Sequence, residues 1–156
     1  MPAPRDTSGP SRRQMLLTAS AAAAVASIGP VPAAHAADTC LFLAATTGAG
    51  RARAALKITG MEREDFIDAA GPLPVGGWTH VALTPGGGTG VLCLDGAETG
   101  RNSATVASPL LLGVTTRSYL GRSQNTSHPY LKGAVRDLRV HNRALTAAEA
   151  ARLAAD

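Results

Sequence analysis

The chain has 156 residues, which is enough for a single domain. Charged residues make up 17% and aromatic residues 3%, with 17 Gly and 10 Pro, a composition typical of a turn-rich extracellular β protein and not of a helical enzyme. The formal net charge of +4 would suit nucleic-acid binding, but three of the 15 basic residues lie before residue 37. The remaining basic residues are spread along the chain, which excludes a nucleic-acid-binding surface.

The first 36 residues have the three parts of an export signal. Arg12 and Arg13 form the charged region, Met15 to Val31 are weakly apolar and rich in Ala, and "AHA" at Ala34 to Ala36 is a small-x-small cleavage site. The paired arginines within S-R-R-x-x-L resemble the twin-arginine motif, which directs folded bacterial proteins across the membrane. We therefore expect residues 1–36 to be a twin-arginine-type signal peptide and residues 37–156 to be the mature, secreted domain.

A transmembrane anchor is the alternative for the same segment. Its apolar run is interrupted by Pro30 and Pro32 before it reaches the roughly 20 residues that a membrane span requires. The sequence thus predicts export, with no membrane attachment once the signal is cleaved.

Short strands are predicted along the mature chain, each bounded by Gly, Pro or Asn. They cover Cys40–Thr46, Arg53–Thr59, Glu64–Ala69, Trp78–Thr84, Gly90–Gly96, Arg117–Ser123 and Gly133–Asn142. Short strands at this spacing, with turn residues between them, predict an all-β protein built as an antiparallel β-sandwich.

The best-marked hairpin joins "WTHVALT" to "GVLCLDG". The intervening "PGGGTG" supplies glycines that tolerate positive φ where the chain reverses. Strand alternation places Val81 and Leu83 on one face and Trp78 and His80 on the other. Because large aromatic residues anchor sandwich cores, we expect Trp78 to be buried.

A single helix is well marked, and it closes the chain. In "LTAAEAARLAA", Thr146 is suited to cap the helix, and Glu149 three residues later completes a capping box. Leu145 before the cap is placed to pack on Ala150. The sequence therefore predicts one short C-terminal helix on an otherwise β chain.

Three segments resemble the laminin G-like or concanavalin A-like jelly-roll modules of secreted bacterial proteins. The hairpin "WTHVALT" and "GVLCLDG" is similar to that family's W-x-H-V-A-x-T and L-Y-V-D-G pair. The stretch "SYLGRSQNTSHPYLKGAVRDLRVHNRAL" is similar to L-G-R-S … Y-F-x-G-x-I-D-D-V-R-I-Y-N-R-A-L, and "TAAEAARL" to the closing S-x-x-E-I-x-x-L helix. The resemblance spans Trp78 to Leu153 and implies a jelly-roll fold.

The chain departs from the family pattern at several positions. Cys93 and His141 stand where the family has Tyr, and Arg136 replaces the first Asp of its D-D pair. The family's opening strands would precede Cys40, where this chain has its predicted export signal. Those strands are then absent, or are supplied by an associated partner chain, or the sequence is a fragment.

Catalytic motifs are absent from the sequence. The histidines show no H-E-x-x-H spacing, and "GRSQN" lacks the final Gly of a nucleophile elbow. The acidic segment "MEREDFIDA" places Glu64 and Asp68 on one strand face and Asp65 on the other. We interpret it as a solvated edge or loop instead of the facing acid pair of a glycosidase, and expect that the protein is not an enzyme.

The resemblance also implies a metal site, because modules of this family often hold Ca²⁺ through an Asp in the last long strand. Asp137 in "GAVRDLRV" matches that Asp. Calcium takes six to eight oxygen ligands, and the neighbouring Arg136 and the missing early strands both count against the site. An ion pair of Asp137 with Arg139 or Arg143 is the alternative.

The cysteines and one loop complete the candidate residues. Cys40 and Cys93 lie in apolar strands, and either a disulfide, which export permits, or two buried free thiols would suit them. The loop "RSQNTSHPY" lies at the rim of the predicted sheet and offers Arg122, Gln124, Asn125 and Tyr130 for contacts with a glycan; a polar connecting loop is the alternative.

Two functions follow from these observations. The resemblance implies an exported, non-catalytic carbohydrate-binding module that acts alone or with secreted glycoside hydrolases on a polysaccharide. The alternative is a structural or protein-interaction module whose open sheet edges pair with a partner chain.

Overall fold

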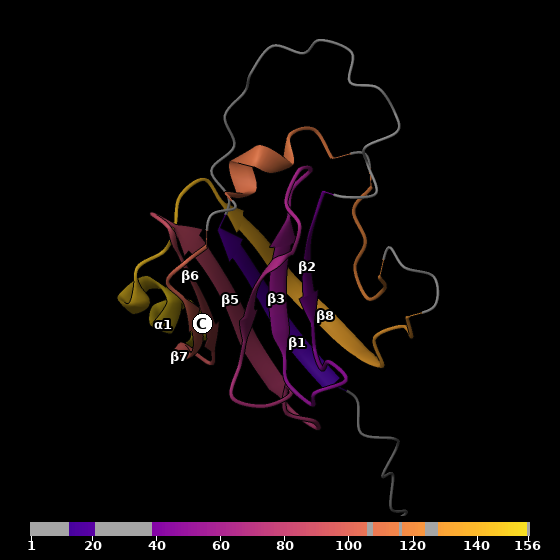
Figure 1. Ribbon diagram of the computed structural model, residues 1–156. Coiled ribbons are helices and arrows are strands. Elements are labelled where there is room, and N and C mark those ends of the chain that lie inside the picture. The colour runs from indigo at the N-terminus through magenta and orange to yellow at the C-terminus, as the bar shows by residue number, and fades with distance from the viewer. Residues whose placement is uncertain (1–12, 21–38, 106–107, 116, 124–127, 156) are drawn as a thin grey trace, which may run out of the picture.

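The computed structural model describes residues 13–20, 39–105, 108–115, 117–123 and 128–155 (Figure 1). The strands in these residues form a five-stranded sheet of order β7-β6-β5-β1-β8 and a three-stranded sheet of order β2-β3-β4. The elements are β1 (Arg13–Ser20), β2 (Cys40–Ala44), β3 (Arg53–Lys57), β4 (Asp65–Asp68), β5 (Trp78–Gly86), β6 (Thr89–Leu94), β7 (Ala97–Asn102), the 3-10 helix η2 (Pro109–Leu112), β8 (Gly133–His141) and α1 (Ala147–Ala155).

Antiparallel hairpins build most of both sheets. Strands β2, β3 and β4 pair antiparallel in chain order, and so do β5, β6 and β7. The predicted antiparallel β-sandwich of jelly-roll type with a C-terminal helix is therefore confirmed. Two differences stand out: Arg117–Ser123 is irregular where a strand was predicted, and the short strand Ala97–Asn102 was not predicted.

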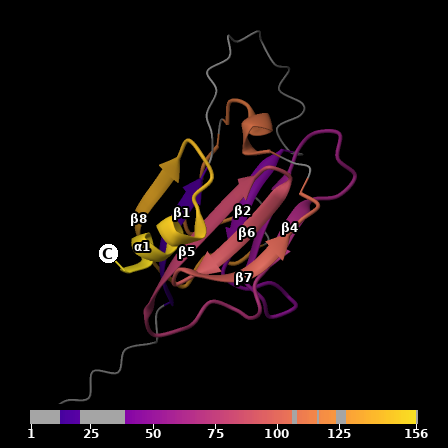
Figure 2. The same ribbon diagram turned by 90° about the vertical axis from the view of Figure 1, so that its left-hand side faces the viewer.

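Strand β1 is the exception to the antiparallel pattern. It lies between β5 and β8 and runs parallel to both of them (Figures 1 and 2). Its residues, Arg13–Ser20, belong to the predicted signal peptide. The other residues of that predicted peptide lie outside the described part of the chain. Part of the predicted export segment thus forms the strand between β5 and β8, a place for which the sequence analysis had predicted no strand.

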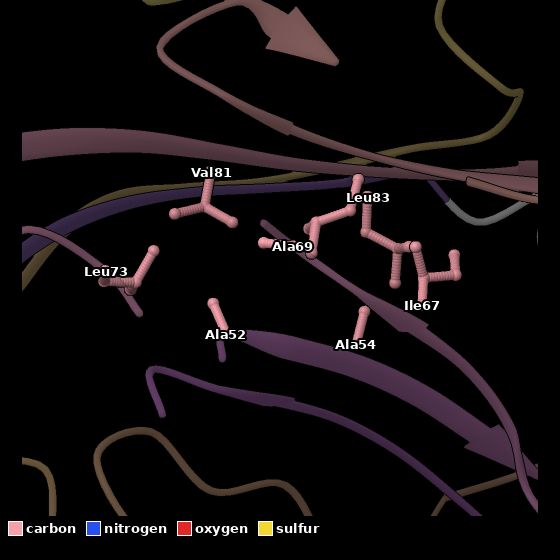
Figure 3. Packing of buried hydrophobic residues seen from close by; sticks show 8 residues of the cluster. Ala52, Ala54, Ile67, Ala69, Leu73, Val81 and Leu83 are labelled. Carbon is pink, nitrogen blue, oxygen red and sulfur yellow. The ribbon is translucent and has the colours of Figure 1, made fainter. Parts of the chain in front are cut away.

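The core lies between the two sheets (Figure 3). Val81 and Leu83 point inward from β5 and meet Ile67 from β4, and Leu92 of β6 is fully buried. The rest of the cluster is formed by one further leucine and small residues, Ala52, Ala54, Ala69 and Leu73. Burial of Val81 and Leu83 on the same face confirms the period-two pattern predicted for this strand.

Helix α1 covers part of the outer face of the five-stranded sheet (Figure 2). Its Ala150 is 1% exposed and packs on Ala82 and Cys93, so the small side chains allow close approach. The predicted capping box is present: the Glu149 N–H donates to Thr146 Oγ1 at 3.3 Å, and the Thr146 N–H donates to Glu149 Oε2 at 2.9 Å. The Arg143 guanidinium also binds this carboxylate, and these contacts hold the pKa of Glu149 far below its usual value.

The two sheets approach each other closely at the β4–β7 edge. The Asn102 side-chain amide donates to the Phe66 carbonyl at 3.2 Å, and Gly100 lies directly against the backbone of Asp68. A register shift in the β6–β7 ladder leaves Thr99 unpaired, and its hydroxyl donates to the Leu92 carbonyl at 3.2 Å. This edge therefore closes the sandwich on the side opposite to β8.

Candidate functional site

The loop between η2 and β8 carries the candidate glycan-binding residues. The Leu131 N–H donates to the Gly121 carbonyl at 2.7 Å, which brings the two ends of the segment between them together. Gly121 has a φ of +76°, a conformation that residues with a side chain rarely adopt. This closure explains how Arg122 and Tyr130, eight positions apart in the sequence, become neighbours.

Arg122 is the centre of this loop. Its guanidinium carbon lies 4.5 Å from the ring centroid of Tyr119 and 6.0 Å from that of Tyr130. Both distances are within the range of a cation–π contact. Tyr119 is 39% exposed and Tyr130 is 71% exposed, so the three side chains form a solvent-facing platform, which we call the Tyr–Arg–Tyr cluster.

The other residues predicted for this loop are only partly placed. Gln124 and Asn125 lie outside the described residues. Next to them, His128 Nδ1 and Ser123 Oγ are 3.1 Å apart, at hydrogen-bond distance. The structure therefore brings together Arg122 and Tyr130 of the predicted set and adds Tyr119, which the sequence analysis had not selected. Tyr119 stands three residues before Arg122 in what was predicted to be a strand, so its proximity could not be seen in the sequence.

Trp78 is not a core residue, contrary to the sequence-based expectation. Its side chain is 40% exposed, and the Arg136 guanidinium carbon lies 4.4 Å from the ring centroid. The inward positions of β5 are those of Val81 and Leu83, which places Trp78 on the opposite, outer face. The sequence correctly predicted that Trp78 and Val81 lie on opposite faces of the strand. Helix α1 covers Ala82 on the outer face but leaves Trp78 partly exposed to solvent.

Asp137, the predicted calcium ligand, lies at an irregularity of β8. It has a φ of +52°, and the register of β8 against β1 shifts at this point. Its carboxylate is 3.5 Å from Arg136 Nε, whereas Arg139 and Arg143 were the predicted ion-pair partners. No group of three or more His, Cys, Asp or Glu able to hold a metal occurs in the described residues. Coordination of calcium by Asp137 stays a prediction.

The acidic segment forms an ion-pair network with Arg53. The Arg53 guanidinium donates to both oxygens of Asp68, at 2.6 and 2.9 Å, and lies 3.6 Å from Glu64 Oε1. These two acids were predicted to share a strand face, and their common partner agrees with that. The hydrogen bonds from Arg53 lower the pKa of Asp68 despite its partial burial. The arrangement is that of a structural carboxylate on a sheet face.

Both cysteines are free thiols in the structure, but only Cys93 is buried, whereas the sequence-based alternative to a disulfide was two buried thiols. Cys93 is buried under α1 on the outer face of the large sheet, and burial raises the pKa of its thiol. Cys40 lies on β2 in the other sheet, where Leu41 and Leu43 are the residues that pack on the core. The two thiols thus lie on different sheets with the core between them.

The residues of the predicted export signal are placed only in part. Arg12 lies outside the described residues, and Arg13 is the first residue of β1. Among the helices of the described residues, none has both the length and the apolar character that a membrane span needs.

A match to a protein family agrees with this architecture. Residues 18–151 match the family described as "Concanavalin A-like lectin/glucanases superfamily", so the match begins inside β1 and ends in α1. A similar solved structure is that of an S-layer domain-containing protein (residues 221–444) from Clostridium thermocellum ATCC 27405, at 34% identity and a TM-score of 0.48. That similarity covers 67% of this chain and 52% of the other, so this chain spans about half of its relative. No curated protein matches the chain. The extent of the family match shows that the chain belongs to the concanavalin A-like lectin/glucanase superfamily.

Proposed function

We propose that the protein is an exported, non-catalytic carbohydrate-binding module, and that it binds a polysaccharide at the Tyr–Arg–Tyr cluster. The observation that carries this proposal is the placement of the chain's tyrosines. The sequence contains two, and both lie within 6.0 Å of the same guanidinium and face solvent. Both tyrosines of the chain therefore lie together on one part of the surface.

The chemistry of the cluster suits a sugar. The C–H face of a pyranose ring stacks on an exposed aromatic ring, and the 71% exposed Tyr130 offers such a ring. A guanidinium carries five N–H donors in a planar fork, which suits vicinal hydroxyl groups. Contact with Tyr119 holds the Arg122 side chain in place, and this reduces the entropy lost when a ligand is bound.

A non-catalytic role is supported by the state of the acidic residues. Glycoside hydrolysis requires two carboxyl groups that face each other across the scissile bond. Asp68 and Glu64 are instead engaged by Arg53, and Asp137 lies against Arg136. Secretion through the twin-arginine route and action beside secreted glycoside hydrolases complete the proposal; the first is motivated by the S-R-R-x-x-L motif, and the second by the family.

The proposal is tested by isothermal titration calorimetry of the full-length chain with a panel of soluble polysaccharides. Replacing Tyr130 by Leu should weaken binding about ten-fold, a loss of roughly 1.4 kcal/mol. Phe66→Leu is the matched control, because Phe66 is also exposed and also stacked with an arginine, Arg53 at 4.1 Å, but belongs to β4. Equal loss in both variants, or no binding of any glycan by a folded chain, contradicts the proposal.

A second function is favoured by the position of β1. A segment of the predicted signal peptide fills the position between β5 and β8, so cleavage would leave β8 without its neighbour in the sheet and one edge of β5 unpaired. Unpaired strand edges are templates for pairing with another chain. A structural or protein-interaction module would use them in this way.

A further inference from the structure

The strand position between β5 and β8 has unusual backbone pairing. We call it the acceptor slot; it is bounded by Trp78–Leu83 of β5 and by β8 (Gly133–His141), and β1 occupies it. The hairpins of both sheets are antiparallel, but β1 is parallel to both of its neighbours. Parallel pairing is slightly less stable per residue than antiparallel pairing, so β1 is not the strongest occupant that the slot can take.

The ladder between β1 and β8 is also interrupted. Leu16 pairs with Arg136 and Thr18 pairs with Arg139, so Asp137 and Leu138 together stand opposite Leu17. Asp137 adopts a φ of +52° at this point. By contrast, the ladder between β1 and β5 runs without a break from Gln14 to Ala19. One side of the slot is therefore incompletely paired while β1 is in it.

The residues of β5 and β8 that flank the acceptor slot indicate which sequence would bind there more tightly than β1. On the core side, Val81 is 1% exposed and Val135 packs on the core, so residues of an occupant that face inward must be apolar. On the outer side, the exposed Arg136 and Arg139 flank the slot, and Arg136 reaches across it to the Trp78 ring. Outward-facing residues of an occupant are therefore favoured when they are acidic.

We propose that the acceptor slot binds an extended segment of a second polypeptide, with apolar and acidic residues in alternation, antiparallel to β5 and β8. In this proposal, residues 13–20 hold the slot as a placeholder during export and vacate it when the signal is cleaved. The segment that addresses the protein for export thereby also prevents premature pairing of its open sheet. The placeholder role rests on the proposed export; the slot itself rests on the pairing and on the residues that line it.

The test uses the full-length chain and a defined probe. The probe is a labelled eight-residue peptide that alternates Val with Glu, and the control peptide has the same composition in two blocks. Leu17→Pro should release β1, because proline cannot donate to either ladder and is excluded from central strands. Ala33→Pro, in the same predicted segment but outside β1, is the matched control. The fraction of chains with an open slot sets the apparent affinity, so Leu17→Pro should bind the probe at least ten-fold more tightly than the control variant.

Hydrogen–deuterium exchange locates the binding. The alternating probe should protect the amides of β5 and β8 and expose those of β1, and the block peptide should do neither. The proposal is overturned if the probe fails to bind a folded Leu17→Pro variant, or if protection appears elsewhere. It is also overturned if Leu17→Pro abolishes cooperative melting even at saturating probe, because β1 is then an integral strand.

The slot and the glycan site are tested separately. Tyr130→Leu removes part of the Tyr–Arg–Tyr cluster and should leave probe affinity unchanged. Leu17→Pro should leave the affinity for glycan unchanged. Failure of one site therefore does not imply failure of the other.

Discussion

The close approach of Gly100 to β4 gives a sharp test of how the sandwich is closed. A Cβ atom built on Gly100 would overlap the Asp68 carbonyl oxygen and lie 2.9 Å from its carbon and 3.0 Å from Ile67 Cγ2. The nearest obstacle is backbone in a neighbouring strand, and such an obstacle cannot be relieved by a change of rotamer. We therefore expect Gly100→Ala to push β7 away from β4.

The size of the effect follows from the obstacle. Overpacking in a well-packed region costs about 1–3 kcal/mol, and a backbone clash belongs at the upper end, near 3 kcal/mol. For a chain of this length, that loss lowers the melting temperature by about 6–12 °C. Gly90→Ala should cost less, about 1 kcal/mol, because its new Cβ would meet the flexible end of the Ile67 side chain, Cδ1, at 2.6 Å.

Urea unfolding followed by far-UV circular dichroism measures these differences. Gly48→Ala is the control, since nothing lies within 4 Å of its built Cβ and its φ is not positive. Its free energy of unfolding should stay within about 0.5 kcal/mol of the parent, or rise slightly through the unfolded state. The expected order of stability is Gly48→Ala, then Gly90→Ala, then Gly100→Ala. If Gly100→Ala is as stable as Gly48→Ala, the sheets do not close at this edge as described.

Three further predictions concern the helix cap, pH and the thiols. Thr146→Ala removes the acceptor for the Glu149 N–H and should lower the free energy of unfolding by about 1 kcal/mol, whereas Thr146→Ser should retain it. Burial lowers the pKa of His80, although the nearby Asp95 carboxylate acts in the opposite direction. The unfolded chain therefore binds a proton more readily than the folded one, so stability should fall as the pH drops below about 6.5; His80→Gln should reduce this fall between pH 7 and pH 5. Thiol titration without reductant should find Cys40 and Cys93 both reactive in denaturant, and neither would react if they were bonded.

Local patterns in the sequence predicted the local structure well. The capping box at Thr146 and the alternation along Trp78–Thr84 depend on neighbours a few residues apart, and both are present. The hairpin β5–β6 was also predictable from its run of turn glycines, and Gly87 and Gly88 do adopt positive φ in the structure. Family motifs then extended the prediction from local elements to the jelly-roll sandwich.

What could not be predicted depends on contacts distant in sequence. The prediction that Trp78 is buried was wrong, because strand alternation shows only that Trp78 faces away from Val81. It does not show whether another element covers that face of the sheet. The contact of Tyr119 with Arg122 depends on loop closure between Gly121 and Leu131. The location of β1 is a further case, because its composition fits an export signal and it pairs with β5 and β8, which are more than 50 residues away in the sequence.

The aromatic residues connect these findings. The sequence has five, and each is at least 38% exposed, although aromatic side chains usually supply much of a sandwich core. The core cluster is instead made of Ala, Val, Leu and Ile. Four of the five rings lie against an arginine: Phe66, Trp78, Tyr119 and Tyr130. A chain that buries small aliphatic residues and keeps its aromatic rings partly exposed gains less stability from those rings than fully buried rings would give.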